Sequence, residues 1–293
     1  MLTVIIGVSA ALIYGSADFL GGIAAKRISP IRVTAIGAIS GLVILFAAEP
    51  IIGGRWSWEA VLYGGISGVT GAIAITLLYA CLAIGPMSIL SPLTALVSAF
   101  VPLMAGVIRG ERLPVLGYIA IGIALVAVVL VGFVKEKGAV RPSLKALLMA
   151  VGSGAMIGAF LILIDLTPDD SGLVPLIANR AVNGTIMFAV VGILALVALR
   201  RPPGTTALLG MLRPGWRAGF WLAVICGTID ATANALLLFG LRIGELSVIS
   251  VLTALYPAGT IILAAVVLRE RIAPVQVVGL VLALIAAGML ALA

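Results

Sequence analysis

Two aspartates lie inside apolar segments of this chain, where an ionised side chain needs a partner, a water-filled cavity or a function. Asp18 lies in the first apolar segment, and Asp230 lies near the middle of the eighth. A charged group inside a membrane span costs about 2.5 to 3.5 kcal/mol on insertion scales. Because desolvation favours the neutral form of a carboxylate, such a group can alternate between a proton and a cationic substrate. Both aspartates are therefore candidates for substrate binding or proton coupling.

Asp18 has a polar neighbour on its own helix face. Tyr14 precedes it by one helical turn, so its hydroxyl is able to hydrogen-bond the carboxylate. The alternative is a solvated aspartate near the helix end, balanced by Lys26 or Arg27. The spacing alone keeps both interpretations open.

Asp230 also has candidate partners. Asn234 follows it at i+4, and Arg180 lies in the seventh apolar segment between Asn179 and Asn183. Asp230 either binds substrate or protons, or it forms a buried ion pair with Arg180 that itself lines the pathway. The asparagines form a polar face, although intramembrane Asn often only joins helices, at about 0.6 kcal/mol per hydrogen bond. Two aromatic residues complete the candidate set as possible cavity walls: Tyr79 and Tyr256.

Other kinds of chemistry are poorly supported. Histidine is absent, which excludes His-based acid/base catalysis and Ser-His triads. Cys81 and Cys226 lie in apolar segments, and no phosphate-binding glycine loop or dinucleotide fingerprint occurs, so no metal and no cofactor is expected. A lipid-modifying enzyme would need convergent acid, base or metal-binding groups. The clustered carboxylates Asp165, Asp169 and Asp170 fit a solvated loop better, so we do not expect an enzyme.

The composition indicates that a lipid bilayer surrounds these residues. Hydrophobic residues make up 63% of 293 positions and charged residues 10%, whereas a soluble domain is roughly half apolar. About 185 apolar residues exceed what one soluble core can bury, but they match about ten spans of roughly 20 residues. The net charge of +7 includes no dense basic cluster, so it indicates membrane topology rather than binding to nucleic acid.

Apolar runs separated by charge, proline and glycine predict an all-α polytopic membrane protein with ten transmembrane helices. The first run lacks a basic n-region and a cleavage pattern, so we expect a retained span and not a signal peptide. The predicted helices span 2–24, 31–48, 59–82, 87–108, 114–134, 144–164, 173–199, 217–241, 246–267 and 273–292.

The sequence repeats itself at a constant offset of 159 residues. The motif IGxxSxxSxLTAL at 84–96 recurs at 243–255, and Glu111-Arg112 recurs as Glu270-Arg271. We expect ion pairing at the helix ends from these Glu-Arg pairs. The repeat predicts a first half at 1–134, a connector at 135–143 and a second half at 144–293. Because each half holds five spans, an odd number, the second half must be inverted relative to the first.

Small residues along the spans predict close helix packing more than ligand binding. The glycine pairs with four-residue spacing are Gly37 and Gly41, Gly64 and Gly68, and Gly154 and Gly158. The hydroxylated positions of the fourth and ninth spans are Ser88, Ser91, Thr94, Ser98, Ser247, Ser250 and Thr253.

The distribution of Lys and Arg predicts an orientation. Thirteen lie in the connections on the side of the central connector, and four lie on the opposite side. Positive loops stay in the cytoplasm. We therefore expect a multi-pass protein of the cell (inner) membrane with both termini outside.

These motifs resemble the drug/metabolite transporter superfamily, EamA type. Tyr14-Gly15-Ser16 stands where that family has Trp-Gly-Ser, and the turn at 109–112 stands where it has Gly-Glu-Arg. Tyr256-Pro257 in the ninth span is similar to the family, whereas the corresponding Val97-Ser98 departs from it. The resemblance implies ten helices in two five-helix repeats and a transport function.

A second resemblance concerns mechanism. Small multidrug-resistance transporters, which resemble one half of this chain, carry an essential carboxylate eight residues before a lysine, as Asp18 precedes Lys26 here. The equivalent stretch of the second half, 159–162, has no carboxylate. The resemblance implies one such site per chain.

We therefore expect a secondary active transporter of small organic metabolites, amino acids or drug-like compounds that works by alternating access. Protons are the candidate coupling ion, and the resemblance implies export. Ten spans in one chain remove any need to dimerise, so we expect a functional monomer. A channel-like facilitator is the alternative class.

Overall fold

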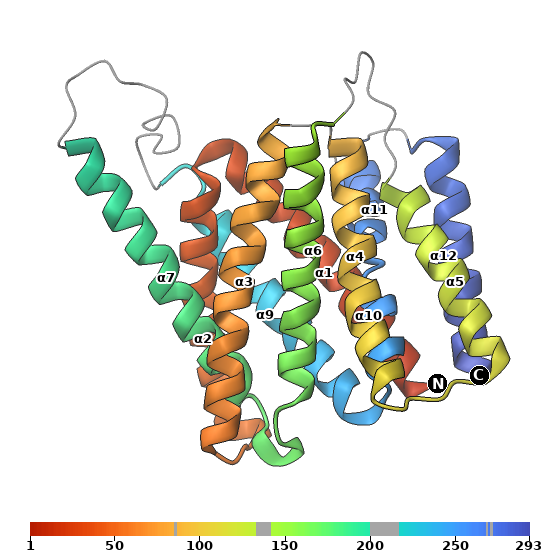
Figure 1. The fold of residues 1–293 in the computed structure, drawn as a ribbon. Helices are drawn as coiled ribbons and strands as arrows, with labels where there is room; N and C mark the ends of the chain where they lie inside the picture. The colour runs from red at the N-terminus through yellow and green to blue at the C-terminus, as the bar shows by residue number, and fades with distance from the viewer. Residues whose placement is uncertain (85–86, 133–141, 200–216, 268, 270–271) are drawn as a thin grey trace.

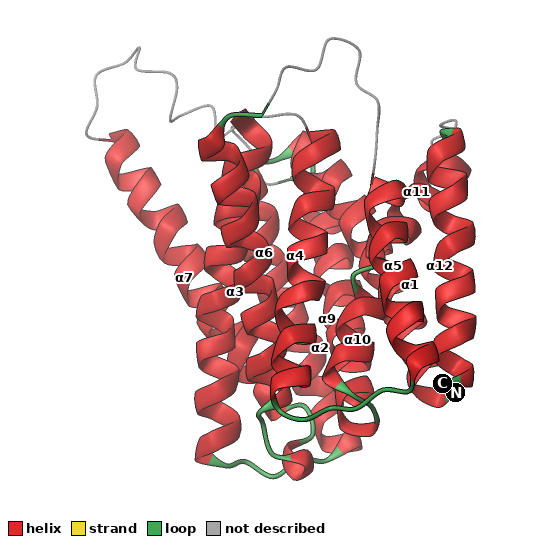
Figure 2. Cartoon of the chain, turned by 45° about the vertical axis from the view of Figure 1, so that its right-hand side comes forward, coloured by secondary structure: helices red, strands yellow, loops and turns green. Residues whose placement is uncertain are grey.

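The computed structural model describes residues 1–84, 87–132, 142–199, 217–267, 269 and 272–293. Within those residues the regular structure is helical throughout (Figure 2). The helices of the first half are α1 (Leu2–Arg27), α2 (Pro30–Ile52), α3 (Trp58–Ile84), α4 (Met87–Ile108) and α5 (Val115–Gly132). Those of the second half are α6 (Leu144–Asp165), the short 3₁₀ helix η1 (Asp169–Ser171), α7 (Val174–Leu199), α9 (Phe220–Ile243), α10 (Leu246–Thr253), α11 (Tyr256–Val267) and α12 (Pro274–Leu292).

Helix starts follow local chemistry. The Ser57 hydroxyl accepts from the Ala60 N–H before α3, and the Ser143 hydroxyl accepts from the Ala146 N–H at the start of α6. Each hydroxyl satisfies a backbone donor that has no partner within the helix. Pro30 and Pro274 open α2 and α12, where proline's missing N–H costs nothing.

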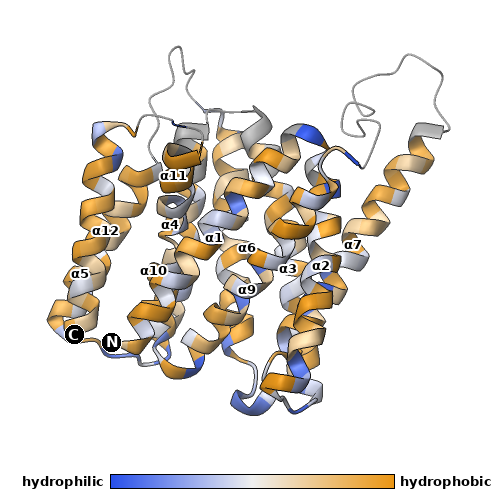
Figure 3. Ribbon diagram, turned by 180° about the vertical axis from the view of Figure 1, so that it is seen from behind, coloured by the Kyte–Doolittle hydropathy of each residue, from blue (hydrophilic) through white to orange (hydrophobic). Residues whose placement is uncertain are grey.

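The long helices suit a membrane. In the described part of the chain, nine helical stretches are long and apolar enough to cross a bilayer, counting Leu246–Val267 as one. A shorter apolar stretch in α4, Leu93–Ile108, completes the predicted ten spans. Hydrophobic residues cover most of the helix lengths, and hydrophilic residues gather toward the ends (Figure 3). The chain is a multi-pass membrane protein.

The two halves have opposite directions in the bundle. Both termini lie at the bottom of the view, whereas α5 ends and α6 begins at the top (Figure 1). Since α1 starts at the bottom, α6 runs opposite to it. The predicted inversion of the second half is confirmed.

Helix contacts obey the same two-fold relation. If α1 to α5 correspond to α6, α7, α9, α10–α11 and α12, then the α1–α9 contact corresponds to α6–α3, and α2–α9 corresponds to α7–α3. The contacts α5–α12, α2–α7 and α4–α10 each correspond to themselves. The halves are therefore interleaved, and most of their packing is with each other.

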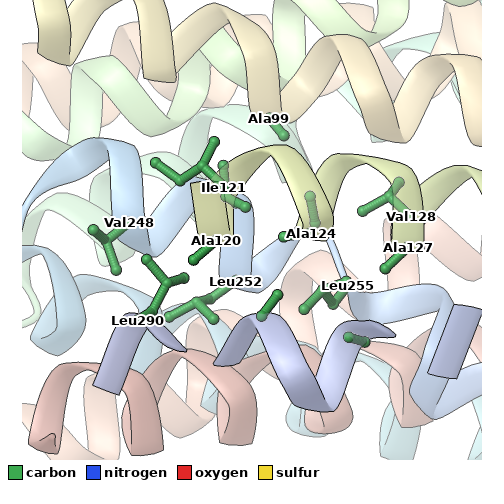
Figure 4. Close-up of a cluster of buried hydrophobic side chains, with 14 of the residues drawn as sticks. Ala99, Ala120, Ile121, Ala124, Ala127, Val128, Val248, Leu252, Leu255 and Leu290 are labelled. Carbon is green, nitrogen blue, oxygen red and sulfur yellow. The ribbon is translucent and has the colours of Figure 1, made fainter. Parts of the chain in front are cut away.

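Small side chains bring the helices together. Ala99 on α4, Ala120 and Ala124 on α5, and Leu252 on α10 belong to one buried cluster (Figure 4). The glycine pairs predicted to pack do so. A Cβ at Gly68 would lie 3.0 Å from the Val182 side chain on α7.

The other two pairs behave likewise. A Cβ at Gly158 would lie 2.7 Å from the Val101 side chain on α4, and one at Gly41 would lie 3.2 Å from the Ala231 side chain on α9. The prediction of a close-packed bundle is confirmed.

One predicted span has the predicted bounds but is not a single regular helix. The sequence predicts a single span over 246–267, but the structure has two helices, α10 and α11, with a turn at Ala254 and Leu255 between them. Pro257 has no N–H to donate to the carbonyl of Thr253, so one helical hydrogen bond is missing at the break. The Leu255 N–H bonds Leu252 O at 3.2 Å instead, one residue short of the α-helical partner.

Candidate functional site

A cavity of about 250 Å³ lies between the two halves, and residues of both line it. The polar residues in its wall are Tyr14, Asp18, Ser98, Asn179, Arg180, Asn183, Asp230, Asn234, Ser250, Thr253 and Tyr256. The apolar part includes Ala74, Ile75 and Leu78 of α3 and Phe160 of α6. The sequence candidates are thus brought together, all except Tyr79, whose side chain is outside the described residues.

Asp18 reaches the cavity from α1 and is exposed there rather than enclosed by protein. Among the described side chains it has no ion pair and no hydrogen bond. The hydrogen bond that the sequence allowed from Tyr14 is absent from the described contacts, although both residues line the cavity. The sequence also suggested Lys26 as a partner of Asp18, but the side chain of Lys26 lies outside the described residues. Asp18 is therefore a carboxylate open to a ligand.

Asp230 forms the ion pair that the sequence raised as an alternative. Its Oδ2 accepts from the guanidinium of Arg180 on α7, and from Asn234 Nδ2 at 3.3 Å. Asn234 also donates to the Asp230 backbone carbonyl at 2.8 Å, which fixes the amide. The Arg180 side chain is 13% exposed and that of Asp230 is 30% exposed. Because both line the cavity, the pair is part of its wall and neutralises itself.

The asparagines of α7 differ from each other. Asn179 donates to the Ser67 hydroxyl at 2.8 Å, and Ser67 donates to Gly64 O at 2.6 Å, which joins α7 to α3. Asn183 is buried, and its Oδ1 has no hydrogen-bond partner among the described residues. A buried amide oxygen without a hydrogen-bond partner costs about 1 to 3 kcal/mol. Asn179 therefore joins α7 to α3, whereas Asn183 lines the cavity and has a buried amide oxygen without a partner in the described structure.

The break between α10 and α11 opens directly onto the cavity. Thr253, Ala254 and Tyr256 surround the break and line the wall. Pro257 leaves the carbonyl of Thr253 without its usual helical donor. Broken helices that present backbone groups at mid-depth are typical of substrate sites in transporters.

Gly15 holds α1 against this break. A Cβ at Gly15 would lie 2.6 Å from the Thr260 backbone nitrogen and 2.7 Å from Gly259 Cα. The Thr260 hydroxyl donates to Gly15 O at 3.1 Å. This close approach carries Tyr14 and Asp18 to the same wall as Tyr256.

The hydroxylated residues serve both packing and the cavity. Thr94 donates to Ala150 O on α6 at 3.2 Å and is buried, as the packing interpretation predicts. Ser98, Ser250 and Thr253 bond carbonyls of their own helices, yet they line the cavity, which the packing interpretation missed. Ser88 and Ser91 have side chains outside the described residues.

Glu111 corrects a further expectation. Instead of pairing with Arg112, its carboxylate accepts from the backbone N–H groups of Leu246 at 2.9 Å and Ser247 at 3.1 Å, and from the Ser247 hydroxyl. A carboxylate at a helix N-terminus satisfies free donors and complements the helix dipole. A residue of the first half thus caps α10 of the second. Glu270 and Arg271 lie outside the described residues.

The same end of the bundle carries further ion pairs. Arg109 bonds Asp165 at 2.6 Å, and Arg242 approaches Asp169 at 3.3 Å while donating to the Thr167 carbonyl at 2.5 Å. These aspartates are thus paired with arginines. In the described part of the chain, no three carboxylate or thiol groups are placed to share a metal ion.

A sequence model of the EamA-like transporter family matches residues 1–133 and 144–292. A crystal structure of another protein superposes with a TM-score of 0.72, covering 99% of this chain and 96% of that chain at 17% identity. This likeness concerns the fold. No curated protein matches the sequence.

Proposed function

The chain belongs to the EamA-like transporter family, and from that premise we propose that it is a secondary active transporter driven by protons. The observation that supports this most is the placement of Asp18. It is a carboxylate inside the bundle, on the wall of a cavity shared by both halves, with no partner among the described side chains.

The size of the cavity favours a small substrate. Its volume of about 250 Å³ is below the roughly 300 to 1,000 Å³ of sites for drug-sized ligands. Polar groups from six helices of the wall offer hydrogen bonds, namely α1, α4, α7, α9, α10 and α11, and apolar residues, among them those of α3 and α6, cover the remainder. A small polar metabolite with a short apolar part fits this wall.

The inverted halves support alternating access as the mechanism. Swapping the conformations of two inverted repeats moves the opening from one side of the membrane to the other while the site stays near the middle. In our proposal the side of the central connector is cytoplasmic, both termini are outside, and a single chain carries a complete pathway. Transport is outward.

Proton coupling is assigned to Asp18. When the cavity is open to one side of the membrane, the Asp18 carboxylate takes up a proton. When the cavity is open to the other side, Asp18 releases the proton and binds the substrate. The ionisable groups that face Asp18 from the packed helices and share its surroundings are Tyr14, Arg180, Cys226, Asp230 and Tyr256. Arg180 and Asp230 form an ion pair with each other. Asp18 has no such partner in the described structure, so we assign to it the exchange of a proton for the substrate.

The test uses Asp18→Asn in the full-length protein. Purified protein is first screened by thermal shift against amino acids, nucleosides, sugars and organic amines, and uptake of each hit is then measured in proteoliposomes with a pH gradient. We expect Asp18→Asn to fold but to lose acceleration by the gradient. The matched control is Glu59→Gln, which removes an exposed carboxylate in the first turn of α3.

Two results would contradict the proposal. One is uptake by Asp18→Asn that still responds fully to the pH gradient. The other is uptake that never exceeds equilibration in any gradient and does not saturate, which would favour the channel-like alternative.

A further inference from the structure

We infer that the cavity selects a small organic monocation that carries N–H groups, and that it rejects anions and zwitterions. This inference rests on the proposed transport function and specifies its substrate. It is based on the charges, hydrogen bonds and rings of the cavity wall.

The charges of the wall come first. Its described charged side chains are Asp18, Arg180 and Asp230. Arg180 and Asp230 form an ion pair, so together they contribute no net charge. Ionised Asp18 leaves the wall with one negative charge. Within a membrane span an uncompensated charge is costly, so a bound monocation that balances Asp18 is favoured.

The geometry of the ion pair argues against an anion. Asp230 accepts from both Arg180 and Asn234, so the arginine already has a carboxylate that is itself held in place. The Arg180 side chain is largely buried, and its Nε lies 3.4 Å from where a Cβ would stand on Gly41. A substrate carboxylate would have to displace Asp230 and would also face Asp18.

Two further features favour an ammonium. Tyr14 and Tyr256 place aromatic rings in the wall beside Asp18, and such rings attract cations. Asn183 lines the cavity, and its buried amide oxygen has no partner in the described structure, so rotation of the amide would present this oxygen to a donor in the cavity. A quaternary ammonium cannot donate to this amide, whereas a primary ammonium can.

The proton balance is then simple. With the cation bound, its positive charge and ionised Asp18 cancel. With the cation gone, a proton on Asp18 gives the same neutral cavity. One cation therefore exchanges for one proton, and the exchange carries no net charge across the membrane.

Four probes with the same branched carbon skeleton test the inference. They are isopentylammonium, isopentyl-trimethylammonium, leucine and isocaproate. Binding to purified full-length protein is measured by calorimetry and by thermal shift. We expect isopentylammonium to bind at least about tenfold more tightly than each of the other three, a difference of about 1.4 kcal/mol.

Variants assign the selectivity to residues. Asp18→Asn should lose isopentylammonium binding, and Asp18→Glu should keep it, which separates charge from folding. Asn183→Leu should bind isopentylammonium and its trimethyl counterpart about equally. Size-exclusion profiles and melting temperatures verify that each variant is folded.

The outcomes separate this inference from the proposed function. Leucine or isocaproate binding as tightly as isopentylammonium overturns the inference, and so does a complete lack of isopentylammonium binding. If leucine were instead transported in a way that depends on pH and on Asp18, the proposed transport function would stand and only the substrate class would be wrong. Uptake of isopentylammonium that generates a membrane potential would overturn the one-for-one exchange.

Discussion

The two halves of the molecule share a fold but not a site. The main helix contacts between the halves are related by a two-fold symmetry, yet the polar groups of the cavity are divided unequally. The first half supplies Asp18 and Tyr14. The second half supplies the Arg180–Asp230 pair, and Asp230 corresponds to Gly71 in the repeat. The symmetry therefore fixes where the helices lie, and the departures from it determine the chemistry.

The repeat-related helices show the same contrast in their backbones. α4 is continuous from Met87 to Ile108, whereas its counterpart is divided into α10 and α11. Pro257 stands in the broken helix where α4 has Ser98. The second half thus has a backbone break at the cavity, next to Pro257, that the first half lacks.

We expect the largest loss of stability when the Arg180–Asp230 ion pair of the second half is broken. Arg180→Met leaves the Asp230 carboxylate inside the bundle without its cation. Breaking such a pair costs about 3 to 5 kcal/mol when it is fully buried. Because the Asp230 side chain is 30% exposed, we expect roughly 3 kcal/mol, measured as a lower melting temperature in detergent.

The matched control for this pair is Arg55→Met, which removes the exposed Arg55–Asp170 pair and should cost less than about 1 kcal/mol. The double variant Arg180→Met with Asp230→Leu should recover most of the loss, since it leaves no unpaired charge. Equal melting temperatures for Arg180→Met and Arg55→Met would show that the cavity pair does not stabilise the second half.

The next effect is on the contact between the halves. Gly15→Ala places a Cβ against the backbone of Thr260 and Gly259, where no side chain can move aside. Overpacking of this kind costs about 1 to 3 kcal/mol and should push α1 away from α11. We expect a lower melting temperature together with weaker binding of whichever ligand the thermal-shift screen identifies.

Gly22→Ala provides the control on the same helix, because a Cβ there meets nothing within 4 Å. It should leave stability unchanged or raise it slightly through helix propensity. If Gly15→Ala behaved like Gly22→Ala, the close approach of α1 to the break would not matter for the site.

The sequence predicts the fold well because its main signals are physical and strong. Ten apolar runs and a repeat at a fixed offset leave one arrangement, an inverted pair of five-helix units. The sequence also finds most of the cavity, since a polar residue such as Asp230 or Asn183 stands out in an apolar span.

Other features have no such signal. The run from Leu246 to Val267 is mostly apolar and reads as one span, so Pro257 is the main sequence feature that points to the break. Glu111 caps a helix 135 positions away, and the nearby Arg112 suggested a local ion pair instead. Thr253 looks like a packing residue because its spacing along the helix does not tell which face meets the cavity.

A smaller effect on stability is expected at the break itself. Pro257→Ala supplies the missing N–H and lets α10 and α11 join, so that the second half becomes like α4. Proline is tolerated in the first turn of a helix, so the stability should rise by no more than about 1 kcal/mol. Transport should slow, because a joined helix loses a hinge.

Initial uptake rates and melting temperatures measure both effects. Pro102→Ala, which removes a proline from the continuous helix α4, is the control and should not slow transport in the same way. Similar rates for the two variants would mean that the break plays no part in the transport cycle.

We expect the smallest change in stability at the N-terminus of α10, where the carboxylates of Glu111 and Glu245 lie. Burial, the charge of Glu111, a hydrogen bond with Glu111 and the charge of Asp165 together raise the pKa of Glu245 above its ordinary value. The folded protein therefore holds a proton that the unfolded chain has lost, and stability decreases as pH rises through the raised pKa. Because Glu245 is exposed, the change should be well under about 1 kcal/mol.

Glu245→Gln should remove this decrease, so that the variant and the native protein have similar melting temperatures in acid and the variant is slightly more stable at neutral pH. Glu59→Gln, a substitution on α3, should leave the pH dependence of the native protein intact. If Glu245→Gln instead lowered stability at neutral pH, the Glu245 carboxylate would stabilise the N-terminus of α10. Capping would then be shared between the two halves instead of being supplied by Glu111 of the first half alone.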